Sequence, residues 1–159
     1  MKTVIIYYSQ HHGNTKKLAD AVAEHCGADI VNVLEKPDID LGEYDLIGFA
    51  SGIYMGKYHQ TLIEFANKNL PSGKNVFFMH TAGSPRENHN SAIKAVADAK
   101  NCNCLGTYFC KGFDTFGPFK LIGGIRKGHP TNDEIKGAEL FYDSIVKKIL
   151  IEAPPAAEE

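Results

Sequence analysis

The stretch YYSQHHGNTKK, residues 7–17, joins an apolar run to an amphipathic segment through one short polar turn. Residues 2–8 are rich in β-branched and aromatic side chains, which is typical of a short buried strand. Residues 15–26 place apolar side chains on one face at helical spacing, namely Leu18, Ala19, Val22, Ala23 and Cys26. The stretch therefore predicts a strand that passes directly into a helix.

The same alternation of strand and helix patterns continues to the end of the chain. Further strands are predicted over residues 29–34, 44–50, 75–81 and 105–109, and further helices over residues 58–70, 88–99 and 131–149. Thr131 followed by Glu134 has the pattern of a capping box, which marks the start of the last helix. Strands that alternate with helices indicate βαβ units with right-handed crossovers, so we predict a doubly wound parallel α/β sheet.

The composition indicates a single domain without a strongly charged surface. With 159 residues, of which 43% are apolar, the chain is long enough to bury its own core, which we expect within residues 1–151. The last segment, EAPPAAEE at residues 152–159, predicts a disordered tail. A net charge of −2 provides no basic field for nucleic acid.

The N-terminal apolar run and the cysteines favour a protein of the reducing cytoplasm. The run is too short for a signal peptide or a membrane span. The four cysteines lack the spacing of a zinc site, and we expect structural thiols at Cys26, Cys102, Cys104 and Cys110.

The first polar turn has the residues of a phosphate site. In a doubly wound sheet, ligands bind at the carboxyl ends of the strands, so the turns after Tyr8, Ala50 and Thr81 are the candidate binding segments. A helix N-terminus presents unpaired N–H groups and the positive end of its dipole to an anion. Around it, Ser9, Thr15 and Asn14 add hydroxyl and amide donors, Gly13 permits close approach, and no carboxylate is present. The turn matches neither a Walker loop nor a G-x-G-x-x-G fingerprint.

The pattern Y-S-x-x-x-G-N-T followed by K-K-L-A resembles the phosphate loop of the flavodoxin family. This resemblance implies a flavodoxin-like sheet of five parallel strands in the order 2-1-3-4-5, with helices on both faces, and a bound FMN. It places the ribityl phosphate of FMN among Ser9, Gln10, His11, His12, Gly13, Asn14 and Thr15. His11 and His12 depart from the family pattern and either contact the phosphate or take no part in binding.

Two later stretches resemble the flavodoxin loops that hold the flavin ring. In ASGIYMGKYHQ, residues 50–60, the resemblance assigns cofactor contacts to Ser51, Gly52, Ile53, Tyr54, Met55, Gly56 and Lys57. It makes Tyr54 and Met55 the ring contacts, and the peptide between Gly56 and Lys57 the one that rotates on reduction. In HTAGSPRENHN, residues 80–90, it assigns a close backbone approach to the flavin edge to Thr81, Ala82, Gly83 and Ser84.

The chain departs from flavodoxins in its third loop and in a long segment near the C-terminus. Many flavodoxins stack an aromatic ring of the third loop on the flavin, and residues 81–89 contain no Phe, Tyr or Trp. The connection over residues 110–130 is unusually long and carries Phe113, Phe116 and Phe119. Phe116 is a candidate cover for the open flavin face; alternatively, these rings anchor the connection to the core or form a dimer interface.

Several functions agree with these features. The resemblance favours an electron carrier between redox partner proteins. The open flavin face favours instead a small FMN-dependent NAD(P)H or quinone oxidoreductase, or a relative of the flavodoxin-like protoporphyrinogen oxidases, acting on a small redox substrate. A binding module of this fold without flavin is a third reading. A receiver domain is disfavoured, because it needs an aspartate where this chain has Ser51.

Overall fold

Five parallel strands form the central sheet of the computed structural model, which describes residues 1–10 and 12–152. Their order across the sheet is β2-β1-β3-β5-β6, which confirms the predicted order of the five main strands. The strands are β1 (Thr3–Tyr8), β2 (Asp29–Asn32), β3 (Leu46–Tyr54), β5 (Asn75–Ala82) and β6 (Asn103–Lys111). The expected phosphate contact His11 lies outside the described residues, as do residues 153–159 of the expected tail.

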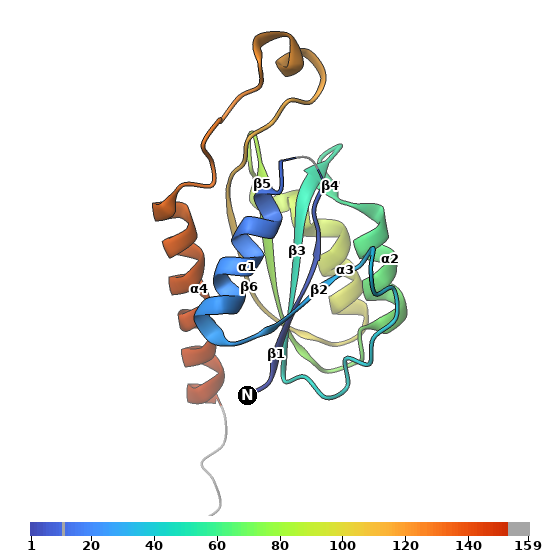
Figure 1. Cartoon of the computed structure of the whole chain (residues 1–159). Helices are drawn as coiled ribbons and strands as arrows, with labels where there is room; N and C mark the ends of the chain where they lie inside the picture. The colour runs from blue at the N-terminus through green and yellow to red at the C-terminus, as the bar shows by residue number, and fades with distance from the viewer. Residues whose placement is uncertain (11, 153–159) are drawn as a thin grey trace, which may run out of the picture.

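Helices cover both faces of the sheet, as Figure 1 shows. Helices α1 (Asn14–Cys26) and α4 (Asn132–Glu152) pack on one face, and α2 (Gln60–Asn69) and α3 (Ser91–Ala99) on the other. The sheet is thus the middle of three layers, so its central strands are apolar on both faces.

Strand β1 illustrates why the sequence forms a central strand. All six of its side chains are buried. Val4 and Ile6 pack into the core beneath α2 and α3, whereas Ile5 and Tyr7 pack into the core beneath α1 and α4. Alternate side chains therefore supply two separate cores.

The last helix begins with the predicted capping box. The N–H of Thr131 donates to Oε2 of Glu134 at 2.8 Å, and the N–H of Glu134 donates to Oγ1 of Thr131 at 3.3 Å. These two bonds satisfy N–H groups that the helix itself leaves without acceptors. Helix α4 extends to Glu152 and packs Ala138, Tyr142 and Ile145 against α1 and the sheet.

The strand register places the three candidate turns at the same edge of the sheet. Tyr8 pairs with Ser51, Ser51 pairs with His80, and His80 pairs with Phe109 across four adjacent strands. Strands β1 and β5 end at this row or within two residues of it, whereas β3 continues past it. The strand register therefore brings the three turns together at the carboxyl edge, as predicted.

Strand β3 continues beyond its predicted end at residue 50 and forms a hairpin. Its last residues pair antiparallel with β4 (Lys57–Tyr58), so Ile53 faces Tyr58 and Tyr54 faces Lys57. Met55 and Gly56 both have positive φ, 52° and 79°, which is typical of a two-residue type I′ turn. The predicted helix start at residue 58 is also wrong, since α2 begins at Gln60 with the His59 side chain as its cap.

The long connection after β6 rises beyond the carboxyl ends of the strands, at the top of Figure 1. Asp114 and Ile125 exchange two backbone hydrogen bonds, 2.9 and 2.7 Å long, and close the base of the loop. A short 3₁₀ helix, η2 (Gly117–Ile122), lies between them, and a second one, η1 (Glu87–Asn90), precedes α3. None of the described helices is long and apolar enough to span a bilayer.

Candidate functional site

The turn between β1 and α1 presents backbone N–H groups at the start of a helix. Gly13 caps α1 in the left-handed conformation with φ 65°, and its carbonyl accepts from the N–H of Lys17. The N–H of Lys16 donates to Oγ of Ser9 at 3.3 Å. Within residues 1–10 and 12–152, no acceptor faces the N–H groups of Asn14 and Thr15. With no acidic side chain in the first turn of the helix, this end of α1 suits an anion.

Two side chains expected to hold phosphate instead connect this turn to other elements. The Asn14 amide Nδ2 donates to the carbonyl of Phe113 at 2.8 Å. The hydroxyls of Thr15 and Thr81 lie 2.9 Å apart and are buried. Both residues therefore fix the position of the turn, and their backbone N–H groups remain the donors available to a ligand.

The second loop contacts the first turn through Tyr54. Its ring folds back over Gly52, where an added Cβ would lie 3.3 Å from the ring. Its hydroxyl accepts a 3.3 Å hydrogen bond from the N–H of Gln10. The ring meets Tyr8 edge-on at 5.6 Å and His59 edge-on at 5.0 Å between centroids. Tyr54 thus lies within an aromatic cluster at the edge of the first turn.

The remaining residues expected from the second loop divide into buried and exposed sets. Ser51 is buried, donates to the carbonyl of Gly52 at 2.6 Å and accepts from the N–H of His59 at 3.1 Å. Ile53 packs against the core. The hairpin tip is exposed, with Met55 at 95% exposure beside Gly56 and Lys57. The tip is therefore the most accessible part of this loop, and Gly52, Ile53 and Tyr54 are partly exposed.

The third loop lies beneath the long connection. An added Cβ on Gly83 would be 2.8 Å from Oδ2 of Asp114 and 2.9 Å from Cδ1 of Ile125. The carbonyl of Gly83 accepts from Nε of Arg126 at 3.3 Å. Ala82 is half-buried and Ser84 is exposed. A glycine is needed at position 83 because the base of the long connection packs directly on it.

The long connection reaches the first turn through Phe113 and Thr115. The Phe113 ring packs against the His12 ring at 4.2 Å between centroids, and Nε2 of His12 lies 3.0 Å from Oγ1 of Thr115. Phe116, the expected flavin cover, is 77% exposed. His12 therefore holds the connection against the first turn.

His80, a residue not expected in the site from the sequence, lies buried just below the carboxyl edge of the sheet. Its ring has no exposed surface and stacks on Phe109 at 5.1 Å. Nε2 donates to the carbonyl of Arg86 at 2.9 Å, so Nδ1 is the acceptor and lies 3.2 Å from the Tyr58 hydroxyl. Burial lowers the pKa of His80 to about 4, and the ring is neutral at pH 7. In the sequence, this buried histidine could have been identified from its position directly after the apolar run NVFFM, residues 75–79.

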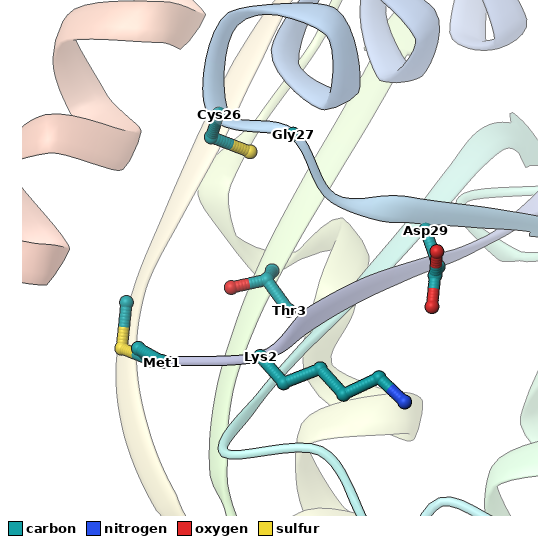
Figure 2. Close-up of a pocket in the computed structure, with 6 residues that line it drawn as sticks. All are labelled: Met1, Lys2, Thr3, Cys26, Gly27 and Asp29. Atoms are coloured by element: carbon teal, nitrogen blue, oxygen red, sulfur yellow. The ribbon is translucent and has the colours of Figure 1, made fainter.

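A surface hollow lies at the opposite edge of the sheet (Figure 2). It has a volume of about 360 Å³ and is lined by Met1, Lys2, Thr3, Cys26, Gly27 and Asp29. Its polar groups already have partners, since Lys2 pairs with Glu43 at 2.7 Å and Asp29 accepts from the Tyr44 hydroxyl at 2.8 Å. The described residues contain no cluster of three His, Cys, Asp or Glu side chains that could bind a metal. The carboxyl edge therefore remains the candidate site.

Comparison with known proteins identifies the family of this chain. Residues 5–106 match the family model of a flavodoxin domain, and the match includes all three turns. The chain belongs to the flavodoxin family. This flavodoxin-family chain is also 43% identical over 150 residues to an uncharacterized protein of Methanocaldococcus jannaschii, with 92% of this chain and 99% of that protein covered.

Solved structures share the fold of this flavodoxin-family protein at low sequence identity. The flavodoxin-like WrbA-like protein of Agrobacterium tumefaciens superposes with a TM-score of 0.71 and 15% identity, covering 96% of this chain and 99% of that one. Oxidised flavodoxin 1 of Bacillus cereus superposes with a TM-score of 0.67 and 15% identity, covering 92% and 98%. The likeness confirms the flavodoxin fold.

The residues of the first turn fit a phosphate monoester. Two N–H groups without described acceptors, the Ser9 hydroxyl and the positive end of a 13-residue helix converge on one turn. Lys16 and Lys17 lie in the first turn of the helix, but Nζ of Lys16 pairs with Asp20 at 2.6 Å and Nζ of Lys17 donates to the carbonyl of Pro130 at 3.1 Å, so the backbone N–H groups remain the main donors. A dianion at this position would accept from the N–H groups that have no acceptor within residues 1–10 and 12–152.

Proposed function

We propose that this protein binds FMN at the carboxyl edge of its sheet and carries electrons between redox partner proteins. The observation that carries the proposal is the pair of N–H groups of Asn14 and Thr15, which have no acceptor among the described residues and lie at a helix start. FMN, when bound, would supply one- or two-electron redox chemistry. The protein would hold its phosphate and control access to its ring.

Each of the three loops has a part in this proposal. Ser9, Gln10, His11, His12 and Gly13 would surround the phosphate together with the N–H groups of α1. The hairpin tip around Met55 would lie beside the ring, and the loop after Thr81 would border its edge. Lys57, exposed on the hairpin, would favour negative charge on the reduced cofactor.

Two of the cysteines, Cys104 and Cys110, are poorly suited to act as a redox thiol. All four are free thiols, and burial raises the pKa of Cys110 to about 12 and that of Cys104 to about 11. Thiols with such pKa values carry almost no thiolate at pH 7 and react slowly. Free thiols are also the usual state in the reducing cytoplasm, where we place the protein.

A second candidate function is an FMN-dependent oxidoreductase that uses NAD(P)H or a quinone. The observation that favours it is the third loop, where residues 82–86 offer no aromatic side chain to cover a flavin face. Phe116, the candidate cover, is itself 77% exposed. A small substrate would then reach the ring directly.

The first experiment is a titration of the flavin-free protein with FMN and with riboflavin, which lacks the phosphate. We expect FMN to bind at least about a hundredfold more tightly, because several charge-assisted hydrogen bonds to phosphate are lost with riboflavin. Ser9→Ala should weaken FMN binding about tenfold and leave riboflavin binding unchanged. Ser144→Ala on the exposed side of α4 is the matched control. Equal affinity for FMN and riboflavin would contradict the proposed phosphate site.

A second experiment separates the two functions. The FMN-loaded protein is mixed with NADPH and a soluble quinone, and NADPH absorbance is followed. An electron carrier shows no steady consumption without a partner reductase. Sustained consumption by the isolated protein would establish the oxidoreductase instead.

A further inference from the structure

The far end of the long connection exposes three large apolar side chains. Phe116, Leu121 and Ile122 are 77%, 90% and 72% exposed. All three lie in or next to η2, which Figure 1 shows at the point of the connection farthest from the sheet. Isolated exposed apolar residues are ordinary, whereas three together at the end of a projection indicate a contact surface.

The structure beneath these side chains holds them outward. The backbone bonds between Asp114 and Ile125 close the base, and the N–H of Gly124 donates to the carbonyl of Phe119 at 2.7 Å. Oδ1 of Asp114 accepts from the N–H of Phe116 at 2.8 Å and fixes the entry to η2. The apolar end is therefore a defined part of the fold.

The same segment is positively charged, in contrast with the rest of the protein. Residues 111–130 contain Lys111, Lys120, Arg126 and Lys127 but only one carboxylate, Asp114, which is used within the loop. All four cationic residues are exposed. The segment thus has a net charge of +3 in a chain whose total is −2. Its charge complements a negatively charged surface.

We propose that residues 111–130 dock the protein onto an anionic lipid bilayer. Phe116, Leu121 and Ile122 would enter the interface between headgroups and acyl chains, with Lys120 of η2 at the headgroups. Arg126 and Lys127 follow the base of the loop and add positive charge behind this end. Apolar side chains surrounded by lysine and arginine are the composition that binds such interfaces. A projecting end inserts into a fluid surface without a preformed groove, whereas a protein partner must supply one. The docking is peripheral, and it goes beyond the proposed redox function.

The test uses vesicles and an intrinsic reporter. The chain contains no tryptophan, so Phe116→Trp introduces a single fluorophore at the proposed point of insertion. The full-length protein is mixed with vesicles of phosphatidylcholine alone or with one quarter phosphatidylglycerol. We expect sedimentation with the anionic vesicles only, a blue shift of the tryptophan emission, and quenching by lipids brominated on the acyl chains. Salt at about 1 M should release the protein.

Paired variants separate the apolar and the charged contributions. Leu121→Ser with Ile122→Ser should weaken binding to anionic vesicles by at least about tenfold. Lys120→Gln and Lys127→Gln should each weaken it roughly fivefold. The matched controls are Leu150→Ser, which changes a 70% exposed leucine near the end of α4, and Lys148→Gln beside it. Both controls should bind as the original protein does, and thermal unfolding checks that every variant is folded.

Three outcomes would overturn the proposal. One is a lack of binding to anionic vesicles by the folded protein. Another is equal weakening by the α4 controls, which would show that the loop has no special part. The third is a change from dimer to monomer on Leu121→Ser with Ile122→Ser in sedimentation equilibrium without vesicles, which would assign the loop to contact with a second copy.

Discussion

The hydroxyl of Tyr54 accepts a 3.3 Å hydrogen bond from the backbone N–H of Gln10. This bond connects the β3–β4 hairpin to the turn between β1 and α1, two segments that are 44 residues apart. Burial raises the pKa of Tyr54, so its hydroxyl stays protonated in the neutral range. This protonated hydroxyl therefore joins the two loops directly.

Tyr54→Phe should strengthen FMN binding about two- to fivefold. The substitution keeps the ring and removes the hydroxyl that competes with the phosphate for the N–H of Gln10. Isothermal titration with FMN measures the effect, and Tyr44→Phe, on the other side of the molecule, is the control. Weaker binding by Tyr54→Phe would show that the hydroxyl contacts the cofactor instead.

Thr15→Val should destabilise the fold by about 1–2 kcal/mol. The change leaves the buried hydroxyl of Thr81 without its partner 2.9 Å away, and an unpaired buried hydroxyl is costly. Thr15→Val combined with Thr81→Val should recover most of the loss, because both partners are then apolar and of similar shape. Urea unfolding of the two single variants and the double variant measures the coupling. Additive losses would contradict it.

The stability of the protein should fall between pH 6.5 and pH 4 because of His80. Burial holds the folded-state pKa at about 4, whereas the unfolded chain takes up this proton near pH 6.5. Below pH 6.5 the unfolded state therefore binds more protons, and the stability present above that pH is lost by as much as about 3 kcal/mol.

Urea unfolding from pH 7 to pH 4.5 measures this dependence. His80→Gln keeps a donor for the carbonyl of Arg86 and removes the titration, so its stability should change less over the same range. His89, whose pKa is also lowered by burial and by Arg86, contributes in the same direction. An equally steep profile in His80→Gln would assign the loss to other groups.

Lys57→Glu should make the potential for the second electron of bound FMN more negative. A unit charge about 8 Å from an ion, at an effective dielectric of about 40, changes its energy by roughly 1 kcal/mol, which is on the order of 40 mV for one electron. Reversing the charge should give about twice that shift. Redox titration measures it, with Lys148→Glu on α4 as the control. No shift, or a positive one, would place Lys57 outside the range of the cofactor.

Gly83→Ala should loosen the long connection without unfolding the sheet. The added methyl group would displace Asp114 and Ile125 from the third loop. Trypsin should then cleave after Arg126 or Lys127 several-fold faster, while thermal unfolding of the sheet changes little. Ser84→Ala, at an exposed neighbouring position, is the control. An unchanged rate of cleavage would mean that the connection tolerates the methyl group.

The fold was predictable because its signals are local and repeated. Strand β1 and helix α1 have the periodicities of a buried strand and an amphipathic helix, and the capping box of Thr131 and Glu134 marks the start of α4. The hairpin after β3 was missed because type I′ turns usually carry Asn-Gly or Asp-Gly. Met55 precedes Gly56 here, so glycine was the only local signal.

The site was predictable in its location and less so in its contacts. The polar turn after β1 identified the helix start whose first N–H groups have no acceptor in the described part of the chain. The bonds of Asn14 to Phe113 and of Thr15 to Thr81 join residues 99 and 66 positions apart, and no local pattern encodes them. No local pattern predicts the glycine at position 83 either, because its contact is with Asp114, far along the chain.

A row of paired residues crosses the sheet and separates two parts of the molecule along the strand direction. The row consists of Tyr8, Ser51, His80 and Phe109. On one side, the strands are packed from both faces and leave little freedom for substitution. On the other side, segments are attached to the sheet through a few contacts each and differ widely in length. The molecule is therefore modular. We therefore expect a segment beyond the row to tolerate changes of length that leave the strand pairing below it intact.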